Sequence, residues 1–164
     1  MKTSRNQGLT LIELVIALAV LAVLGTLALP SLGSRLDRQR LDTAAETLVA
    51  DINEARFEAA RQGRAMHIVL QPGAAWCWAV ASNAACPCGQ AQACELRSVR
   101  GPDHAGVALV AGQTLHLQST GQAEAPGSAL LESRGGEQLR VDMQSLGRAR
   151  ICAARGTSTR YPPC

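Results

Sequence analysis

The stretch GLTLIELVIALAVLAVLGTLALP, residues 8–30, decides the fold. From Leu9 to Leu29 its only charged side chain is Glu13, and about 20 apolar residues in a row are enough for a helix to cross a bilayer. A carboxylate inside hydrocarbon costs roughly 2.5–3.5 kcal/mol on insertion scales, so we expect Glu13 to have a purpose. A secretory signal peptide has a shorter apolar region followed by a small-x-small cleavage site, and an ordinary membrane anchor does not account for Glu13.

A short polar leader ends at Gly8, and the sequence GLTLIE that begins there resembles the processing site of type IV pilins and the related pseudopilins. The resemblance implies that a dedicated prepilin peptidase cuts between Gly8 and Leu9 on the cytoplasmic side and then methylates the new amine of Leu9. Most members of the family have phenylalanine at the position of Leu9. Leucine keeps that position apolar, so we expect cleavage to occur.

The same resemblance gives roles to Glu13 and Pro30. Glu13 is the fifth residue after the implied cut, where the family has a glutamate, and Pro30 falls on the helix-bending proline of the family. Pairing with a cation in the same low-dielectric layer offsets the cost of burying a carboxylate. In a filament that cation is implied to be the N-terminal amine of the adjacent subunit, so Glu13 is expected to favour assembly and to fix the register of subunits.

An amphipathic helix is predicted to continue from the apolar segment to about Gln62, with Gly63 as its stop. Apolar residues recur there at three- and four-residue steps: Leu41, Ala45, Leu48, Ile52, Ala55 and Ala59. The acids between them are expected on the solvent side: Asp42, Glu46, Asp51, Glu54 and Glu58.

Short strands punctuated by Gly, Pro and Ser follow Gly63. The predicted strands are 65–71, 75–81, 95–100, 107–110, 114–118, 129–132, 138–144 and 148–153. A long helix packed on an antiparallel sheet is an α+β fold and is also the pilin architecture. We therefore expect a leader at 1–8, a transmembrane and filament-core helix at 9–30, an amphipathic half of the same helix at 31–63, and a β-rich head at 64–164.

The order of a long helix, the sequence GRAMHIVLQP, a Trp-Cys-Trp strand and a short tail is similar to the minor-pilin subgroup that includes FimT, FimU and GspH. In the Trp-Cys-Trp strand, Trp76 and Trp78 share one face. They are interpreted as core anchors of a head poor in aromatic residues, and the alternative is a stacking platform for bases.

Six cysteines behind a membrane-insertion segment predict disulfides formed outside the cytosol. Two bridges are expected among Cys77, Cys86, Cys88 and Cys94. A zinc site on these four thiolates is the alternative, but their spacing is not that of two CxxC knuckles, so we predict no metal and no cofactor. His67, His104 and His116 are scattered without ligand spacing, and no nucleophile–base pair is recognisable, so the chain is predicted not to be an enzyme.

The C-terminal stretch SLGRARICAARGTSTRYPPC is basic: it contains Arg148, Arg150, Arg155 and Arg160 and no acid, in a chain with a formal net charge of only +3. Ser145-Leu146-Gly147 is predicted to turn the chain, after which Arg148, Arg150 and Cys152 share the outer face of a returning strand. A Cys152–Cys164 disulfide is expected to bring the other two arginines close to the first pair.

Such a cluster suits an anion, and DNA phosphate is the favoured one because the planar guanidinium matches phosphate geometry. Gly147-Arg148-Ala149-Arg150 resembles a Gly-Arg-x-Arg motif of FimT-type minor pilins, which are implicated in capturing DNA for natural transformation. Arginines that keep an edge strand soluble, or that contact a neighbouring pilin, are alternative interpretations.

The sequence thus predicts a minor type IV pilin that binds DNA non-specifically. Its expected partners are major and minor pilins, prepilin peptidase, DNA and, before assembly, the inner membrane. We expect a single-pass inner-membrane protein with a periplasmic head that later enters an extracellular pilus. The alternative is a structural minor pilin or type II secretion pseudopilin that primes or caps a filament without binding DNA.

Overall fold

The computed structural model describes residues 10–82, 86–88, 94–156, 158 and 160–164, and for residues 25–32 it describes the backbone alone. The predicted leader 1–8, with Gly8, and the implied new N-terminus Leu9 lie outside the described residues, as does the side chain of Pro30. The chain divides into two compact units, Met1–Leu36 and Asp37–Cys164. We describe each unit by itself and call Asp37–Cys164 the head.

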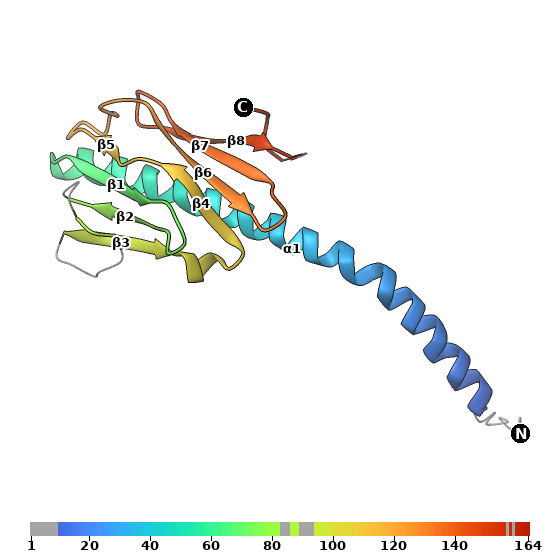
Figure 1. Cartoon of the computed structure of the whole chain (residues 1–164). Coiled ribbons are helices and arrows are strands. Elements are labelled where there is room, and N and C mark those ends of the chain that lie inside the picture. Colours follow the sequence, from blue (N-terminus) through green and yellow to red (C-terminus); the bar gives the residue numbers. More distant parts are fainter. Residues whose placement is uncertain (1–9, 83–85, 89–93, 157, 159) are drawn as a thin grey trace, which may run out of the picture. The chain divides into compact units, whose positions relative to one another are not determined.

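Helix α1 spans Leu11–Gln62 and so contributes to both units (Figure 1). Its start is set by Thr10, whose hydroxyl lies 3.4 Å from the backbone nitrogen of Glu13 and accepts its hydrogen bond, as a helix N-cap does. In the first unit the described apolar side chains are exposed, from Leu11 at 81% to Leu24 at 58%. Within the part of the chain that is described, we find no helix whose length and apolarity would let it cross a membrane.

The head combines the second half of α1 with eight strands and one short 3₁₀ helix, η1 (Gly101–His104). The strands are β1 (Met66–Gln71), β2 (Cys77–Ala81), β3 (Glu95–Arg100), β4 (Val107–Gly112), β5 (Leu115–Leu117), β6 (Gly127–Ser133), β7 (Gln138–Met143) and β8 (Ala149–Arg155). All eight predicted strands are present, with bounds within two residues of the prediction, and the predicted α+β class is confirmed. The 3₁₀ helix was not predicted.

Two antiparallel four-stranded sheets make up the head, with strand orders β3-β2-β1-β5 and β4-β6-β7-β8 (Figure 1). One apolar cluster joins α1 to both sheets, because the helical stripe of Leu41, Leu48 and Ile52 is buried against strand residues such as Ile68 and Leu131. The predicted stripe is therefore confirmed, and it fixes the sheets to the helix. At the edge of the second sheet lies β8, which begins within the predicted arginine motif and contains Arg150.

The two tryptophans belong to this core, with Trp76 4% exposed and Trp78 fully buried. Their rings are stacked, with centroids 5.3 Å apart and planes 15° apart. The interpretation as core anchors is confirmed, because both residues are members of the main apolar cluster.

Asp51 corrects the prediction for the helix, because it is 1% exposed rather than on the solvent side. Its Oδ2 accepts a hydrogen bond of 2.7 Å from Nε1 of Trp78, and its Oδ1 lies 3.1 Å from Nε of Arg97. Burial raises the pKa of Asp51, while the hydrogen bond from Trp78 and the charge of Arg97 oppose that shift. A buried carboxylate with two such partners links the helix to β2 and β3.

Candidate functional site

The predicted turn before the arginine motif is formed by the β7–β8 hairpin. The backbone NH of Gly147 donates to the carbonyl of Gln144 at 2.8 Å, and the NH of Gln144 donates to the carbonyl of Arg148 at 2.9 Å. Gly147 has a φ of 74°, which is the left-handed region that glycine adopts without strain. The hairpin therefore holds Arg148 directly after a tight, hydrogen-bonded turn.

Arg148 and Arg150 are both exposed; Arg148 directly precedes β8, and Arg150 is the second residue of that strand. Side chains two apart in an extended chain lie on the same face, with a separation of about 6.6 Å along the strand. Within the described part of the chain, neither arginine forms an ion pair with an acid. These two guanidinium groups are thus available to an external anion.

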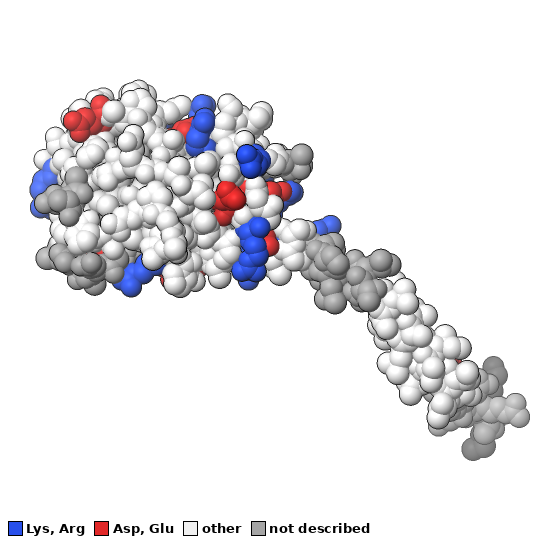
Figure 2. Space-filling model, viewed as in Figure 1, with Lys and Arg blue, Asp and Glu red and all other residues white. Residues whose placement is uncertain are grey.

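The face around them is not free of acids, which differs from the prediction. Asp142 of β7 lies directly opposite Arg150 in the register of the hairpin, and its Oδ1 is 2.9 Å from Nε of Arg140 on the same strand. Figure 2 likewise shows arginines and acids interspersed on the face in view, without a continuous field of one sign. The sequence of the tail has no acid, but strand pairing places one beside it.

A hollow of about 580 Å³ lies beside Arg150, between the β7–β8 turn and the start of β6. Its polar lining comprises Ser128, Asp142, Gln144, Ser145 and Arg150. Hydroxyl and amide groups beside a guanidinium are suited to hydrogen-bond an oxyanion.

Cys152 and Cys164 form a disulfide, with their Cα atoms 5.0 Å apart. The last residues then run parallel to the free edge of β8, where the NH of Ala153 donates to the carbonyl of Pro162 at 2.8 Å and the NH of Cys164 donates to the carbonyl of Ala153 at 3.1 Å. This pairing covers an edge that would otherwise expose unpaired backbone groups.

Arg160 was expected to lie close to Arg148 and Arg150, but it does not. It is held against α1, with its guanidinium nitrogens 2.6 Å from Glu46 and 3.9 Å from Asp42. The neighbouring Tyr161 hydroxyl donates to Glu46 at 2.9 Å, and burial together with this hydrogen bond raises the pKa of Tyr161 to about 12. Arg160 and Tyr161 thus contact the helix instead of adding to the pair Arg148 and Arg150.

Arg155 is exposed but lies at the other end of β8, opposite Gln138. Seven residues of strand separate it from Arg148, which is roughly 23 Å at 3.3 Å per residue. The four predicted arginines therefore divide into one close pair, Arg148 and Arg150, and two separate residues.

The other four cysteines also form disulfides, Cys77–Cys88 and Cys86–Cys94. They pack with Val69, Ala79 and Ala81 in a second apolar cluster. This cluster covers the face of the first sheet that points away from the main core.

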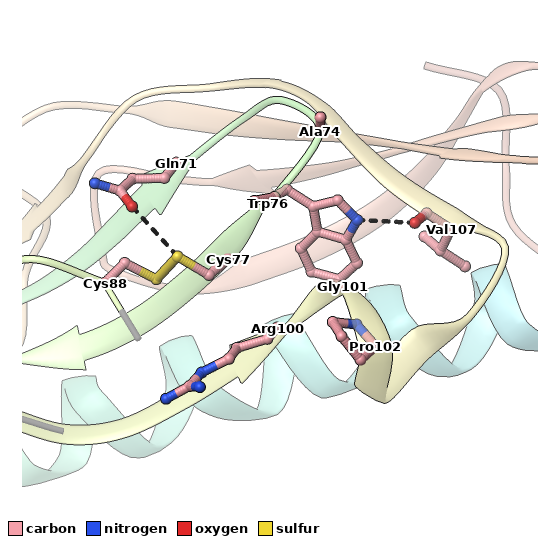
Figure 3. A pocket seen from close by; sticks show the side chains of 10 residues that line it. Gln71, Ala74, Trp76, Cys77, Cys88, Arg100, Gly101, Pro102 and Val107 are labelled. Atoms are coloured by element: carbon pink, nitrogen blue, oxygen red, sulfur yellow. Dashed lines mark hydrogen bonds between the residues drawn. A yellow bond between two sulfur atoms is a disulfide. The ribbon is translucent and has the colours of Figure 1, made fainter. Parts of the chain in front are cut away.

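A pocket of about 620 Å³ adjoins the Cys77–Cys88 disulfide (Figure 3). Trp76 lines it with its Nε1 already donating to the carbonyl of Val107 at 2.8 Å. Arg100 is the one charged residue in the lining. No nucleophile or acid–base pair is present among the described residues that line it.

The histidines are less scattered than the sequence suggested. His67 of β1 and His116 of β5 are register partners, with their Nδ1 atoms 3.0 Å apart. Burial, together with the neighbouring His116, lowers the pKa of His67. No group of three or more potential metal ligands occurs among the described residues. Two histidines 49 positions apart give no local signal, so only the strand register could have revealed this pair.

Comparisons with known proteins place these features in a family. Residues 44–147 match the family described as "Type II transport protein GspH", and residues 3–29 match the "Prokaryotic N-terminal methylation motif". No curated protein matches the chain.

Two solved structures are similar in fold, and both are crystal forms of the type IV minor pilin FimU of Pseudomonas aeruginosa. The form in space group P21 is 20% identical, covers 73% of this chain and 96% of that chain, and has a TM-score of 0.56. The form in space group P65 is also 20% identical, covers 71% and 98%, and has a TM-score of 0.52. At this identity the likeness concerns the fold alone. The matched family covers more than half of the chain, and the chain belongs to it: it is a minor pilin or pseudopilin of the GspH family, which is structural and non-enzymatic and whose methylation motif implies inner-membrane anchoring before filament assembly.

Proposed function

We propose that this subunit binds DNA non-specifically through Arg148 and Arg150 once it is part of a type IV pilus, and that it serves DNA uptake. The observation that carries the proposal is that Arg148 and Arg150 are exposed at a hydrogen-bonded hairpin turn and form no ion pair with a described acid. The family implies other pilins and prepilin peptidase as partners. We propose DNA as a further partner because the guanidinium groups of Arg148 and Arg150 suit phosphate, and because the sequence around them resembles the Gly-Arg-x-Arg motif.

The hollow beside Arg150 adds the hydroxyls of Ser128 and Ser145 and the amide of Gln144 as donors to an oxyanion, and the carboxylate of Asp142, which pairs with Arg140, lines it as well. Arg148 and Arg150 lie on a turn and a strand edge, so we expect their contacts to be to phosphates rather than to bases. Two arginine–phosphate contacts contribute about −1.8 to the slope of log K against log salt. A single head is therefore expected to bind weakly and without sequence preference.

The double substitution Arg148→Gln/Arg150→Gln is expected to lower the magnitude of this slope by about 1.8. As a result, the ratio of the binding constant of the unsubstituted chain to that of the variant should fall about 12-fold between 50 and 200 mM salt. Fluorescence anisotropy with a labelled duplex of mixed sequence measures both quantities. The matched control is Arg155→Gln/Arg160→Gln, which removes the same charge elsewhere. Equal binding by the unsubstituted chain and Arg148→Gln/Arg150→Gln would refute the proposal.

A purely structural subunit, of either a pilus or a type II secretion filament, is the second candidate. It is favoured by Asp142, which lies opposite Arg150 and pairs with Arg140. A face of mixed charge suits a neighbouring protein subunit better than a polyanion. In that case both double variants would bind DNA as weakly as the unsubstituted chain, while filament formation would depend on Arg150.

The role of Glu13 in assembly is proposed for either candidate. Glu13→Val is expected to be cleaved after Gly8 but to enter filaments about tenfold less or worse, because a buried ion pair with the adjacent N-terminal amine is lost. Immunoblots of sheared filaments and of membranes measure the amount of subunit in filaments and the amount that stays in the membrane. Glu13→Asp, which keeps the charge, is the control. Normal incorporation of Glu13→Val would contradict the pairing account.

A further inference from the structure

Arg56 of α1 lies against the same turn that carries the arginine motif. A Cβ atom built on Gly147 would be 3.1 Å from Cδ of Arg56, and one built on Gly121 would be 3.1 Å from Cγ of Arg56. Both glycines are buried, whereas Arg56 is half-buried. The aliphatic part of this arginine therefore packs against two turns, and an arginine with a buried stem keeps its charged end toward solvent.

The two turns are joined to each other by the backbone. The first turn follows β5 and is closed by the NH of Gly121 donating to the carbonyl of Gln118 at 2.8 Å. The NH of Ala123 then donates to the carbonyl of Ser145 in the β7–β8 turn at 3.0 Å. Helix, first turn and hairpin turn thus form one connected platform, and this holds Arg56 and Arg148 in fixed places beside Gly147.

Two arginines, Arg56 and Arg148, belong to this platform. Neither turn, 118–122 or 144–148, contains an acidic residue. Arg56 forms no ion pair within the described residues, in contrast to Arg38, Arg61 and Arg97, which are paired with Glu137, Glu58 and Asp51. The exposed side chains of the turns, such as Gln118, Thr120 and Ser145, supply hydrogen-bond donors.

We propose that Arg56 is the third cation of the DNA-binding surface, so that the surface consists of Arg56, Arg148 and Arg150 rather than of the four arginines of the tail. This inference rests on the proposed function, and it adds a residue of α1 to a surface that the sequence placed in the C-terminal tail alone. The surface then extends from α1 across both turns onto β8. A third phosphate contact changes the expected salt slope from about −1.8 to about −2.7.

The test uses the full-length chain in a zwitterionic detergent and a labelled duplex of mixed sequence. Arg56→Gln is expected to lower the magnitude of the slope of log K against log salt by about 0.9. The ratio of the binding constant of the unsubstituted chain to that of the variant then falls about 3.5-fold between 50 and 200 mM salt. Arg56→Lys, which keeps the charge, should restore most of the slope, whereas a structural defect would not be rescued in this way. Arg155→Gln removes the same charge at the far end of β8 and should leave the slope unchanged.

The outcomes separate the two proposals. If Arg148→Gln/Arg150→Gln weakens binding and Arg56→Gln behaves like Arg155→Gln, the inference about Arg56 is wrong and the proposed function stands. If the unsubstituted chain shows no salt-dependent binding, both proposals are overturned together. A lowered slope in Arg56→Gln, restored in Arg56→Lys, supports the three-arginine surface.

Discussion

Replacing Asp51 with alanine is expected to lower the free energy of unfolding of the head by about 3–5 kcal/mol. The carboxylate is 1% exposed, accepts the indole NH of Trp78 at 2.7 Å and lies 3.1 Å from Nε of Arg97. Alanine would leave the buried NH of Trp78 without its acceptor and Arg97 without its closest acid, and unpaired buried polar groups are costly. Urea unfolding of the compact unit Asp37–Cys164 measures the loss.

Glu54 provides the matched control, because it also contacts Arg97, at 3.4 Å, but is exposed. Glu54→Ala removes an ion pair at the surface, where such pairs contribute little, so a change within about 0.5 kcal/mol is expected. Asp51→Asn should fall between the two variants, since its carbonyl oxygen can still accept from Trp78. Similar losses for Asp51→Ala and Glu54→Ala would show that the buried contact is not what stabilises the head.

Asp51 also shows where reading the helix from residue type alone fails. It was assigned to the solvent side because it is an acid, yet it follows Leu48 by three positions and precedes Ala55 by four. Residues at those spacings share one helix face, so geometry alone places it with the buried stripe. The helical spacing in the sequence therefore indicated a buried position for Asp51, but the prediction followed its charged side chain instead.

The eight strands were predictable because alternation and turn residues act within a few positions of each other. Which strands pair was not predictable in the same way, and neither were the partners within the group Cys77, Cys86, Cys88 and Cys94, since four cysteines allow three pairings. The Cys152–Cys164 disulfide, in contrast, was predicted and is present. The contact between His67 and His116 depends on the register of β1 and β5. Local pattern therefore predicted the elements, and contacts between distant residues determined the rest.

In the candidate site, too, local pattern predicted some features, and contacts between distant residues determined the others. Alternation correctly placed Arg148 and Arg150 on exposed positions after a turn. In contrast, the ion pair of Arg160 with Glu46 joins residues more than 100 positions apart, and the packing of Arg56 against Gly147 joins α1 to the last hairpin. Both contacts arise because the tail and the turns fold back onto the helix. Neither contact can be predicted from the residues that neighbour it in the sequence.

Gly147→Ala is expected to destabilise the head by about 2–6 kcal/mol. Part of the loss is backbone strain, since a φ of 74° at a residue other than glycine costs about 1–3 kcal/mol. The other part is steric: the new Cβ would lie 2.2 Å from the carbonyl oxygen of Gly121 and 3.1 Å from Cδ of Arg56, and overpacking a close contact typically costs about 1–3 kcal/mol. Urea unfolding of the unit Asp37–Cys164 gives the total.

Gly136→Ala measures the backbone strain alone, because Gly136 has a φ of 80° but nothing within 4 Å of its added Cβ. The strain is then nearly the same in both variants, and their difference reports the close approach of the two turns. Equal losses would mean that the platform of Arg56, Gly121 and Gly147 is not tightly packed. If Gly147→Ala loses more, it should also weaken DNA binding without changing any charge, because displacing the turn moves Arg56 and Arg148 apart. The glycine of the Gly-Arg-x-Arg sequence would then be required because it lets the helix arginine and the strand arginine meet at one turn.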